Sequence, residues 1–155
     1  MKHNTIVNTF RIAAITALAL GMAPMTKAAD KGCSNATLKG AFVHSGTGFI
    51  TAPPAQAGPF AHVSVQTFDG KGVLTSTGFV SVNGNIIPTT ETGTYTVNPD
   101  CTGTGTLFVS PIGLTSRVFF VIDDGGNGLQ VISTDPGLVV TGFSRRQFPL
   151  GDLRN

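Results

Sequence analysis

The distribution of apolar and polar residues along the chain predicts a protein built from β-strands. Val, Ile, Phe, Leu and Thr recur in short runs, and the turn-forming residues Gly, Asn, Asp and Pro separate these runs. No apolar repeat of helical period extends over ten residues after residue 28. The pattern predicts strands at residues 37–46, 62–68, 73–82, 93–97, 103–109, 114–122, 129–134 and 138–145.

Short connections join most of these runs, so sequence neighbours are expected to pair as antiparallel hairpins. The dipeptide Asn83-Gly84, for example, is typical of a type I′ hairpin turn. An open sheet of eight strands would expose two edges, and closure into a barrel removes both. We therefore predict an all-β fold, an eight-stranded antiparallel up-and-down barrel, with a β-sandwich as the alternative.

Alternation within the runs assigns side chains to faces. Phe42 and His44 share one face of the first run, whereas the run at 114–122 is apolar on both faces, with Phe120 on one and Phe119 on the other. Strands that are apolar on both faces are usually covered on both. We expect either an outer surface that self-associates or an apolar lumen with a covering segment.

Two connections are longer than a hairpin turn and are candidate places for a site. Residues 50–61 are apolar and rich in proline, which lowers the entropy of holding such a segment in place. This segment is long enough to act as a lid over one mouth of a barrel. Residues 85–92 form the second connection. The alternative is that both are ordinary surface loops.

The N-terminus has the pattern of a secretory signal peptide, predicted at residues 1–28. Basic Lys2 and Arg11 are followed by an apolar run at 12–22, which is too short to span a membrane, and then by small residues before a cleavage site after Ala28. Residues 29–155 are then expected to form a single β-barrel domain that is secreted or periplasmic. That domain has 7 Lys and Arg against 8 Asp and Glu. Without a basic stripe, we expect no nucleic-acid partner and no membrane span after cleavage.

The two cysteines, Cys33 and Cys101, are expected to form a disulfide. An even number of cysteines in an exported chain pairs by default, and neither has the C-x-x-C spacing of a redox or metal motif. The bond would connect the start of the first strand to the turn before the fifth. A disulfide over this sequence separation stabilises a fold by roughly 4 kcal/mol, because it restricts the unfolded chain.

Candidate chemistry is sparse. His44 and His62 are the only histidines after residue 28, and both point inward with Gln66 if their shared face forms the lumen. A histidine pair with a nearby acid such as Glu91 can move protons or bind a metal. The spacing matches no metal-ligand motif, however, so we expect no metal and no cofactor. Partly buried or solvated structural histidines are the favoured interpretation, and ligand binding is the alternative.

Arg117 is a further candidate for ligand binding, because it lies within an apolar run. An ion pair is the alternative role, and Asp123 or Asp135 is the expected partner.

Three segments carry a resemblance to a known group of proteins. These are C-S-N-A-T-L-K-G-A-F, G-T-Y-T-V-N-P-D-C-T-G-T-G-T-L and D-P-G-L-V-V-T-G, and together they resemble small secreted bacterial proteins of unknown function. The similarity covers nearly the whole chain after residue 28. It implies a calycin-like barrel similar to that of allene oxide cyclase and dirigent proteins. The shared residues are cysteines and turn residues, so no catalytic position is carried over.

Three functions from different classes remain open. The first is binding of a small apolar ligand inside the barrel. The second is a cyclase or isomerase of the allene oxide cyclase kind, in which the cavity shapes a reactive substrate. The third is a structural or adhesive surface protein that assembles as a homo-oligomer through an apolar outer face. The sequence contains no catalytic motif, so whether the protein is an enzyme stays open.

Overall fold

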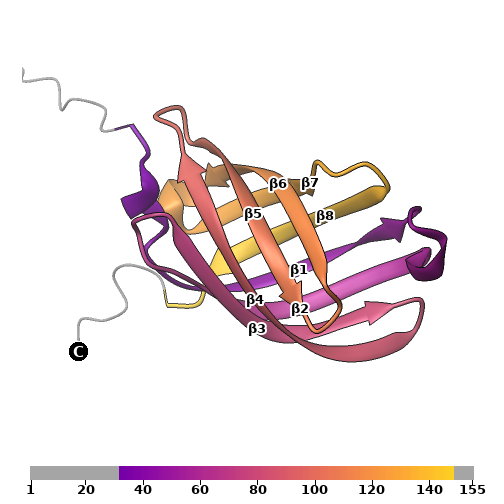
Figure 1. The fold of residues 1–155 in the computed structure, drawn as a ribbon. Coiled ribbons are helices and arrows are strands. Elements are labelled where there is room, and N and C mark those ends of the chain that lie inside the picture. The colour runs from indigo at the N-terminus through magenta and orange to yellow at the C-terminus, as the bar shows by residue number, and fades with distance from the viewer. Residues whose placement is uncertain (1–31, 149–155) are drawn as a thin grey trace, which may run out of the picture.

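A computed structural model describes residues 32–148, and these residues fold into a closed eight-stranded barrel (Figure 1). The strands are β1 (Gly40–Ile50), β2 (Gly58–Phe68), β3 (Val73–Val82), β4 (Asn85–Val97), β5 (Thr102–Ser110), β6 (Leu114–Asp123), β7 (Gly128–Ser133) and β8 (Leu138–Arg146). Three short 3-10 helices are η1 (Asn35–Leu38), η2 (Pro54–Gln56) and η3 (Asp124–Gly126). The signal peptide predicted for residues 1–28 lies outside the described residues.

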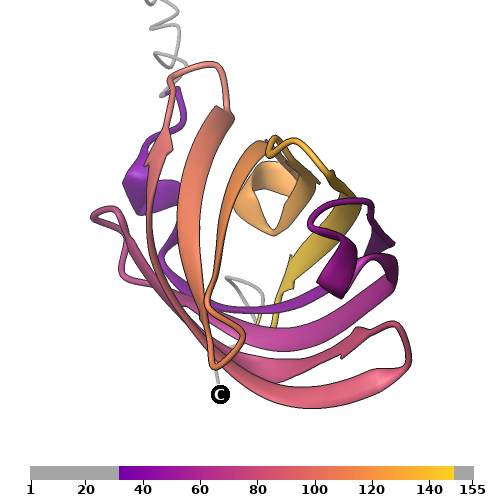
Figure 2. The same cartoon turned by 45° about the vertical axis from the view of Figure 1, so that its right-hand side comes forward.

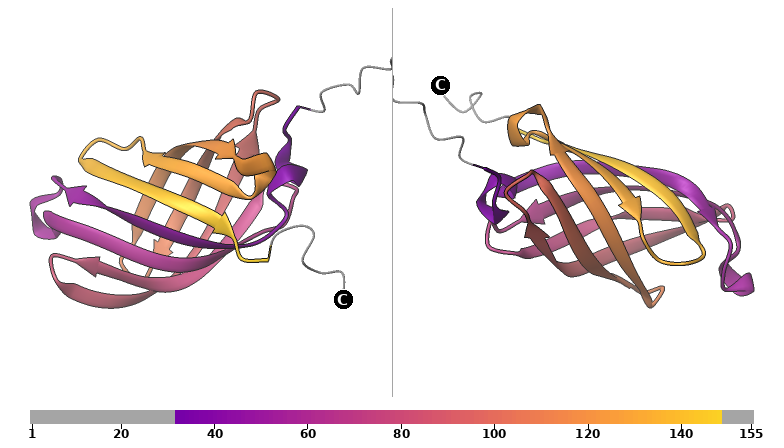
Figure 3. Two further views of the ribbon diagram at one scale, coloured as in Figure 1. Left: turned by 180° about the vertical axis from the view of Figure 1, so that it is seen from behind. Right: turned by 90° about the horizontal axis from the view of Figure 1, so that it is seen from above.

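Each strand pairs antiparallel with its sequence neighbours, and β1 also pairs with β8 to close the wall (Figures 2 and 3). The register places His44 opposite Ser64 on one side and opposite Ser144 on the other. The predicted up-and-down barrel is therefore confirmed, and the sandwich alternative is wrong. Short hairpin connections and the absence of free edges favour this topology.

The strand ends differ from the sequence prediction at two connections. Residues 85–92 were expected to form a loop, but they are the first part of β4, which follows directly on the two-residue turn Asn83-Gly84. Both turn residues have positive φ, as a type I′ turn requires. Pro88 is tolerated because β4 pairs with β5 only from Thr90 onward, so the strand has a free edge at Pro88.

The connection at 50–61 is also shorter than expected, because β2 begins at Gly58. What remains between β1 and β2 is a brief link that contains η2, whose residues are half-buried or exposed. At the other end of β1, the expected first three strand residues, 37–39, belong to η1 or to its C-cap.

One end of the barrel, here called the closed end, is covered by η1 (Figure 1). Leu38 of η1 is fully buried and packs with Phe42, Phe68 and Tyr95 in the main apolar core. Cys33, just before η1, forms the predicted disulfide with Cys101, with a Cα–Cα distance of 4.9 Å.

Arg146 at the end of β8 holds the same end of the barrel together. Its guanidinium donates hydrogen bonds to the carbonyl oxygens of Lys39, Thr37 and Gly126 and to Asn127 Oδ1. It also lies 4.5 Å from the centre of the Phe42 ring, within cation–π range. Arg146 is only 5% exposed, so these contacts replace water around a buried charge.

No helix in the described part of the chain has the length and apolar character needed to cross a bilayer. The disulfide is typical of proteins outside the cytoplasm.

Candidate functional site

The interior of the barrel contains a cavity of about 110 Å³ between the closed end and the opposite mouth. Inward-facing side chains from all eight strands line it, and most of these side chains are apolar. Typical apolar lining residues are Ile50, Leu74, Val80, Leu107, Val118 and Val140. A few polar residues contributed by β1, β2, β4 and β8 share the lining, and they form the candidate site.

A hydrogen-bonded cluster joins three of these strands. His44 Nδ1 on β1 lies 2.6 Å from Ser144 Oγ on β8, and Ser144 Oγ donates to Gln66 Oε1 on β2 at 3.3 Å. All three side chains are buried. When the Ser144 hydroxyl donates to Gln66, Nδ1 of His44 carries the proton in their hydrogen bond. This leaves Nε2 of His44 as an acceptor without a partner among the described residues.

His62 packs against His44, with ring centres 4.5 Å apart and the ring planes tilted by 34°. Two glycines make room for these rings, since a Cβ at Gly142 would lie 2.7 Å from His44 Cε1 and one at Gly46 would lie 2.7 Å from His62 Cε1. Burial lowers the pKa of His44 to about 3, with a further contribution from His62, and burial lowers the pKa of His62 to about 4. Both imidazoles are therefore neutral at neutral pH.

The histidine pair predicts how stability depends on pH. Between about pH 6.5 and pH 4 the imidazoles of the unfolded chain take up protons, while those of the folded chain stay neutral. The free energy of unfolding is therefore expected to fall as the pH is lowered through this window. Urea unfolding at a series of pH values measures the effect.

The variant His62→Gln is expected to weaken this pH dependence, because one imidazole with a depressed pKa is lost. An unchanged pH dependence in His62→Gln would contradict the assignment of the effect to the buried pair. Glu91 changes the free energy of unfolding in the opposite direction. Burial raises its pKa, so the folded state loses stability relative to the unfolded state as the pH rises above 4.5.

Glu91 brings a carboxyl group to the wall of the cavity from β4. It is only 7% exposed and lies opposite Ser76 in the β3–β4 register, which in turn lies opposite Gln66. Burial raises the pKa of Glu91, and the facing Ser76 hydroxyl only partly offsets this effect. Within the described chain, Ser64 Oγ and His62 Nδ1 are buried without a hydrogen-bond partner. The polar side of the cavity is thus incompletely satisfied by the protein itself.

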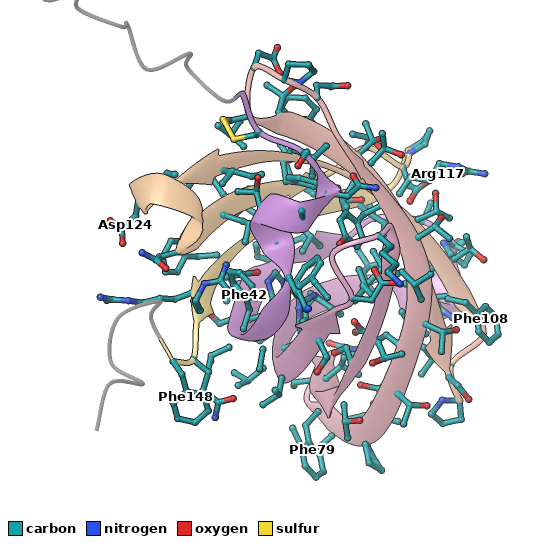
Figure 4. The ribbon with its side chains drawn as sticks, turned by 90° about the vertical axis from the view of Figure 1, so that its left-hand side faces the viewer. Phe42, Phe79, Phe108, Arg117, Asp124 and Phe148 are labelled. Carbon is teal, nitrogen blue, oxygen red and sulfur yellow. A yellow bond between two sulfur atoms is a disulfide. The ribbon has the colours of Figure 1, made fainter. Side chains whose placement is uncertain are left out.

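The structure brings together His44, His62 and Gln66, three of the four residues selected from the sequence, but not Arg117. Arg117 points away from the barrel (Figure 4), and its side chain is 67% exposed and forms an ion pair with Asp135 at 2.9 Å. The expected partner is therefore found, whereas a role for Arg117 in the cavity is not supported. Sequence reasoning missed Ser144, although the alternation of β8 places it on the same face as Val140.

No three His, Cys, Asp or Glu side chains within residues 32–148 come close enough to hold a metal ion. The chemistry that the cluster can perform is hydrogen bonding and proton exchange. The neutral imidazoles of His44 and His62 can accept protons, and the carboxyl group of Glu91, which lines the same cavity, can donate or accept one.

The outer wall carries many exposed apolar side chains, such as Phe79 and Phe108, which project from the barrel in Figure 4. A shallow groove crosses β6, β7, β8 and β1 on this outer side, where Phe119, Ile132 and Phe143 line it. The groove contains no ionisable side chain. It therefore offers an apolar contact surface without acid–base groups, and the expected self-association stays a prediction.

Comparison with known proteins does not add a relative: the chain matches no protein-family model, no curated protein and no solved structure.

Proposed function

We propose that the protein is a binding protein that holds one small ligand, with an apolar body and a polar end, inside the barrel. The observation that carries the proposal is the combination in one cavity of an apolar wall and a polar side formed by His44, Gln66 and Glu91. Binding pockets commonly have this composition, in which a few polar groups orient a ligand held by apolar contacts. We place this function in the secreted or periplasmic space.

The size of the cavity limits the ligand. An apolar cavity of about 150 Å³ holds a benzene molecule. A cavity of about 110 Å³ therefore suits a ligand with a body of about four or five carbon atoms. Larger ligands would require the mouth around Phe60 and Leu138 to widen.

The variant Val118→Phe tests the proposal by filling the cavity. Val118 lines the cavity, so a larger side chain at this position extends into the cavity volume. Binding of pentan-1-ol, measured by ligand-detected NMR, is expected to weaken at least about tenfold in this variant. The control is Val63→Phe, which adds the same side chain at a position that is 59% exposed on the outer wall.

Equal binding of pentan-1-ol to Val118→Phe and to the unchanged protein would place binding outside the cavity. Absence of binding to the unchanged protein, together with no retained small molecule in native mass spectra of protein secreted by its own host, would remove the proposal.

A second candidate function is an isomerase or cyclase, of the kind that the resemblance to allene oxide cyclase implies. The raised pKa of Glu91 supports it, because burial favours the protonated carboxylic acid, which is the form that can donate a proton to a bound substrate. The neutral imidazole of His44 is then a candidate acceptor. Conversion of a bound ligand to an isomer of the same mass, lost in Glu91→Gln, would favour this function over simple binding.

A further inference from the structure

Glu91 is a buried carboxyl group without a cationic partner. Only 7% of its surface is exposed to solvent, and its side chain lines the cavity. The only ion pair among residues 32–148 is the one between Arg117 and Asp135 on the outer wall. Arg146, the one buried arginine in the described part, is bound to oxygen atoms at the closed end.

The neighbouring groups inside the barrel do not supply the missing charge. His44 and His62 are neutral, and Gln66 and Ser144 are uncharged and already bonded to each other. The lumen therefore holds one acidic group and no basic group that is charged at neutral pH. A buried carboxylate in such surroundings requires either a proton or a cation beside it.

We propose that the ligand is a small amine, whose ammonium group pairs with Glu91 while its hydrocarbon part occupies the apolar portion of the cavity. This inference rests on the proposed binding function and specifies the ligand's polar end. An ammonium group has donors only, and the groups free to bond inside the barrel include acceptors that match it, the Glu91 carboxyl and His44 Nε2. Hydrogen bonds between two charged groups are also stronger than neutral ones.

The same surroundings disfavour an anionic ligand. A carboxylate or phosphate group in the cavity would face Glu91 with no cation to offset the repulsion, since Arg117 is outside and the exposed Lys39 and Lys71 lie at the closed end. Neutral ligands such as alcohols avoid this repulsion but leave the carboxyl without a counter-charge. The order of affinity expected for ligands of equal chain length is therefore amine, then alcohol, then carboxylate.

The test compares three compounds with the same five-carbon chain: pentylamine, pentan-1-ol and pentanoate. Binding to the mature protein is measured at neutral pH by ligand-detected NMR and calorimetry. We expect pentylamine to bind at least about tenfold more tightly than pentan-1-ol, and pentanoate not to bind. In Glu91→Gln, which keeps the size of the side chain, the dissociation constants of the amine and the alcohol are expected to become about equal.

The matched control is Thr89→Val, two residues earlier on β4, which removes a buried polar group that does not line the cavity. This variant is expected to keep the preference for the amine, and circular dichroism checks that both variants fold. If pentan-1-ol binds but pentylamine binds no better, or if Glu91→Gln keeps the preference, the amine inference is wrong and the binding function stands. If none of the three compounds binds and no small molecule is retained in native mass spectra, both proposals fail together.

Discussion

Removal of the Cys33–Cys101 disulfide is expected to lower the free energy of unfolding by about 4 kcal/mol, which is a large part of the stability of a typical domain. The two cysteines are separated by 68 positions in the sequence, so the bond restricts a large part of the unfolded chain. In the folded protein it attaches the segment before η1 to the turn that precedes β5. Its loss should therefore release the cover of the closed end first.

Urea unfolding of the double variant with serine at both cysteines measures the effect. Cys101 has a φ of 66°, a conformation that glycine adopts more easily than serine. A second double variant, Cys33→Ser with Cys101→Gly, therefore separates the loss of the bond from backbone strain at this position. A loss below about 1 kcal/mol in both variants would show that the bond does not stabilise the barrel in the way described.

Replacement of Arg146 by methionine is expected to lower the free energy of unfolding by about 3 kcal/mol. The guanidinium serves four oxygen acceptors, which belong to η1 or its C-cap, to η3 and to the residue after η3. Methionine fills a similar volume but donates no hydrogen bond, so these oxygens would be left buried without donors. The desolvation of the arginine itself is removed, which keeps the net loss below the sum of the separate bonds.

Arg145 provides the matched control, because it is adjacent on β8 but exposed on the outer face. Arg145→Met is expected to change the free energy of unfolding by less than about 0.5 kcal/mol. Equal effects of the two substitutions in urea unfolding would mean that the contacts of Arg146 do not hold the closed end together. Hydrogen exchange of the η1 amides, expected to accelerate only in Arg146→Met, locates the effect.

The barrel itself could be predicted from the sequence because strand alternation and hairpin turns are local signals. The strand bounds were less accurate where tertiary pairing overrides a local signal. Pro88 suggested a loop, but it lies in a part of β4 that pairs on one side only, so it does not interrupt the sheet. Residues 37–38 have strand-like composition, yet they belong to η1, whose position is fixed by its contacts with Arg146 and with the core.

The candidate site was predictable only in part, for a related reason. The alternation of side chains along the strands is enough to place His44, His62 and Gln66 on inward faces. The hydrogen bond between His44 and Ser144 depends on the register between the first and last strands, which are 100 residues apart at this point. The exclusion of Arg117 depends on which face of β6 is inward, a choice that its apolar residues on both faces leave open.

The most direct test of the account uses the imidazole signals of a protein that comprises residues 29–155. After residue 28 the chain contains only two histidines, His44 and His62, and both line the cavity. In two-dimensional NMR spectra that report the ring nitrogens, titration with pentylamine at neutral pH is expected to shift both neutral imidazoles to saturation, and Val118→Phe should suppress the shift. Unchanged imidazole signals, with shifts confined to residues of the outer wall, would contradict binding inside the barrel.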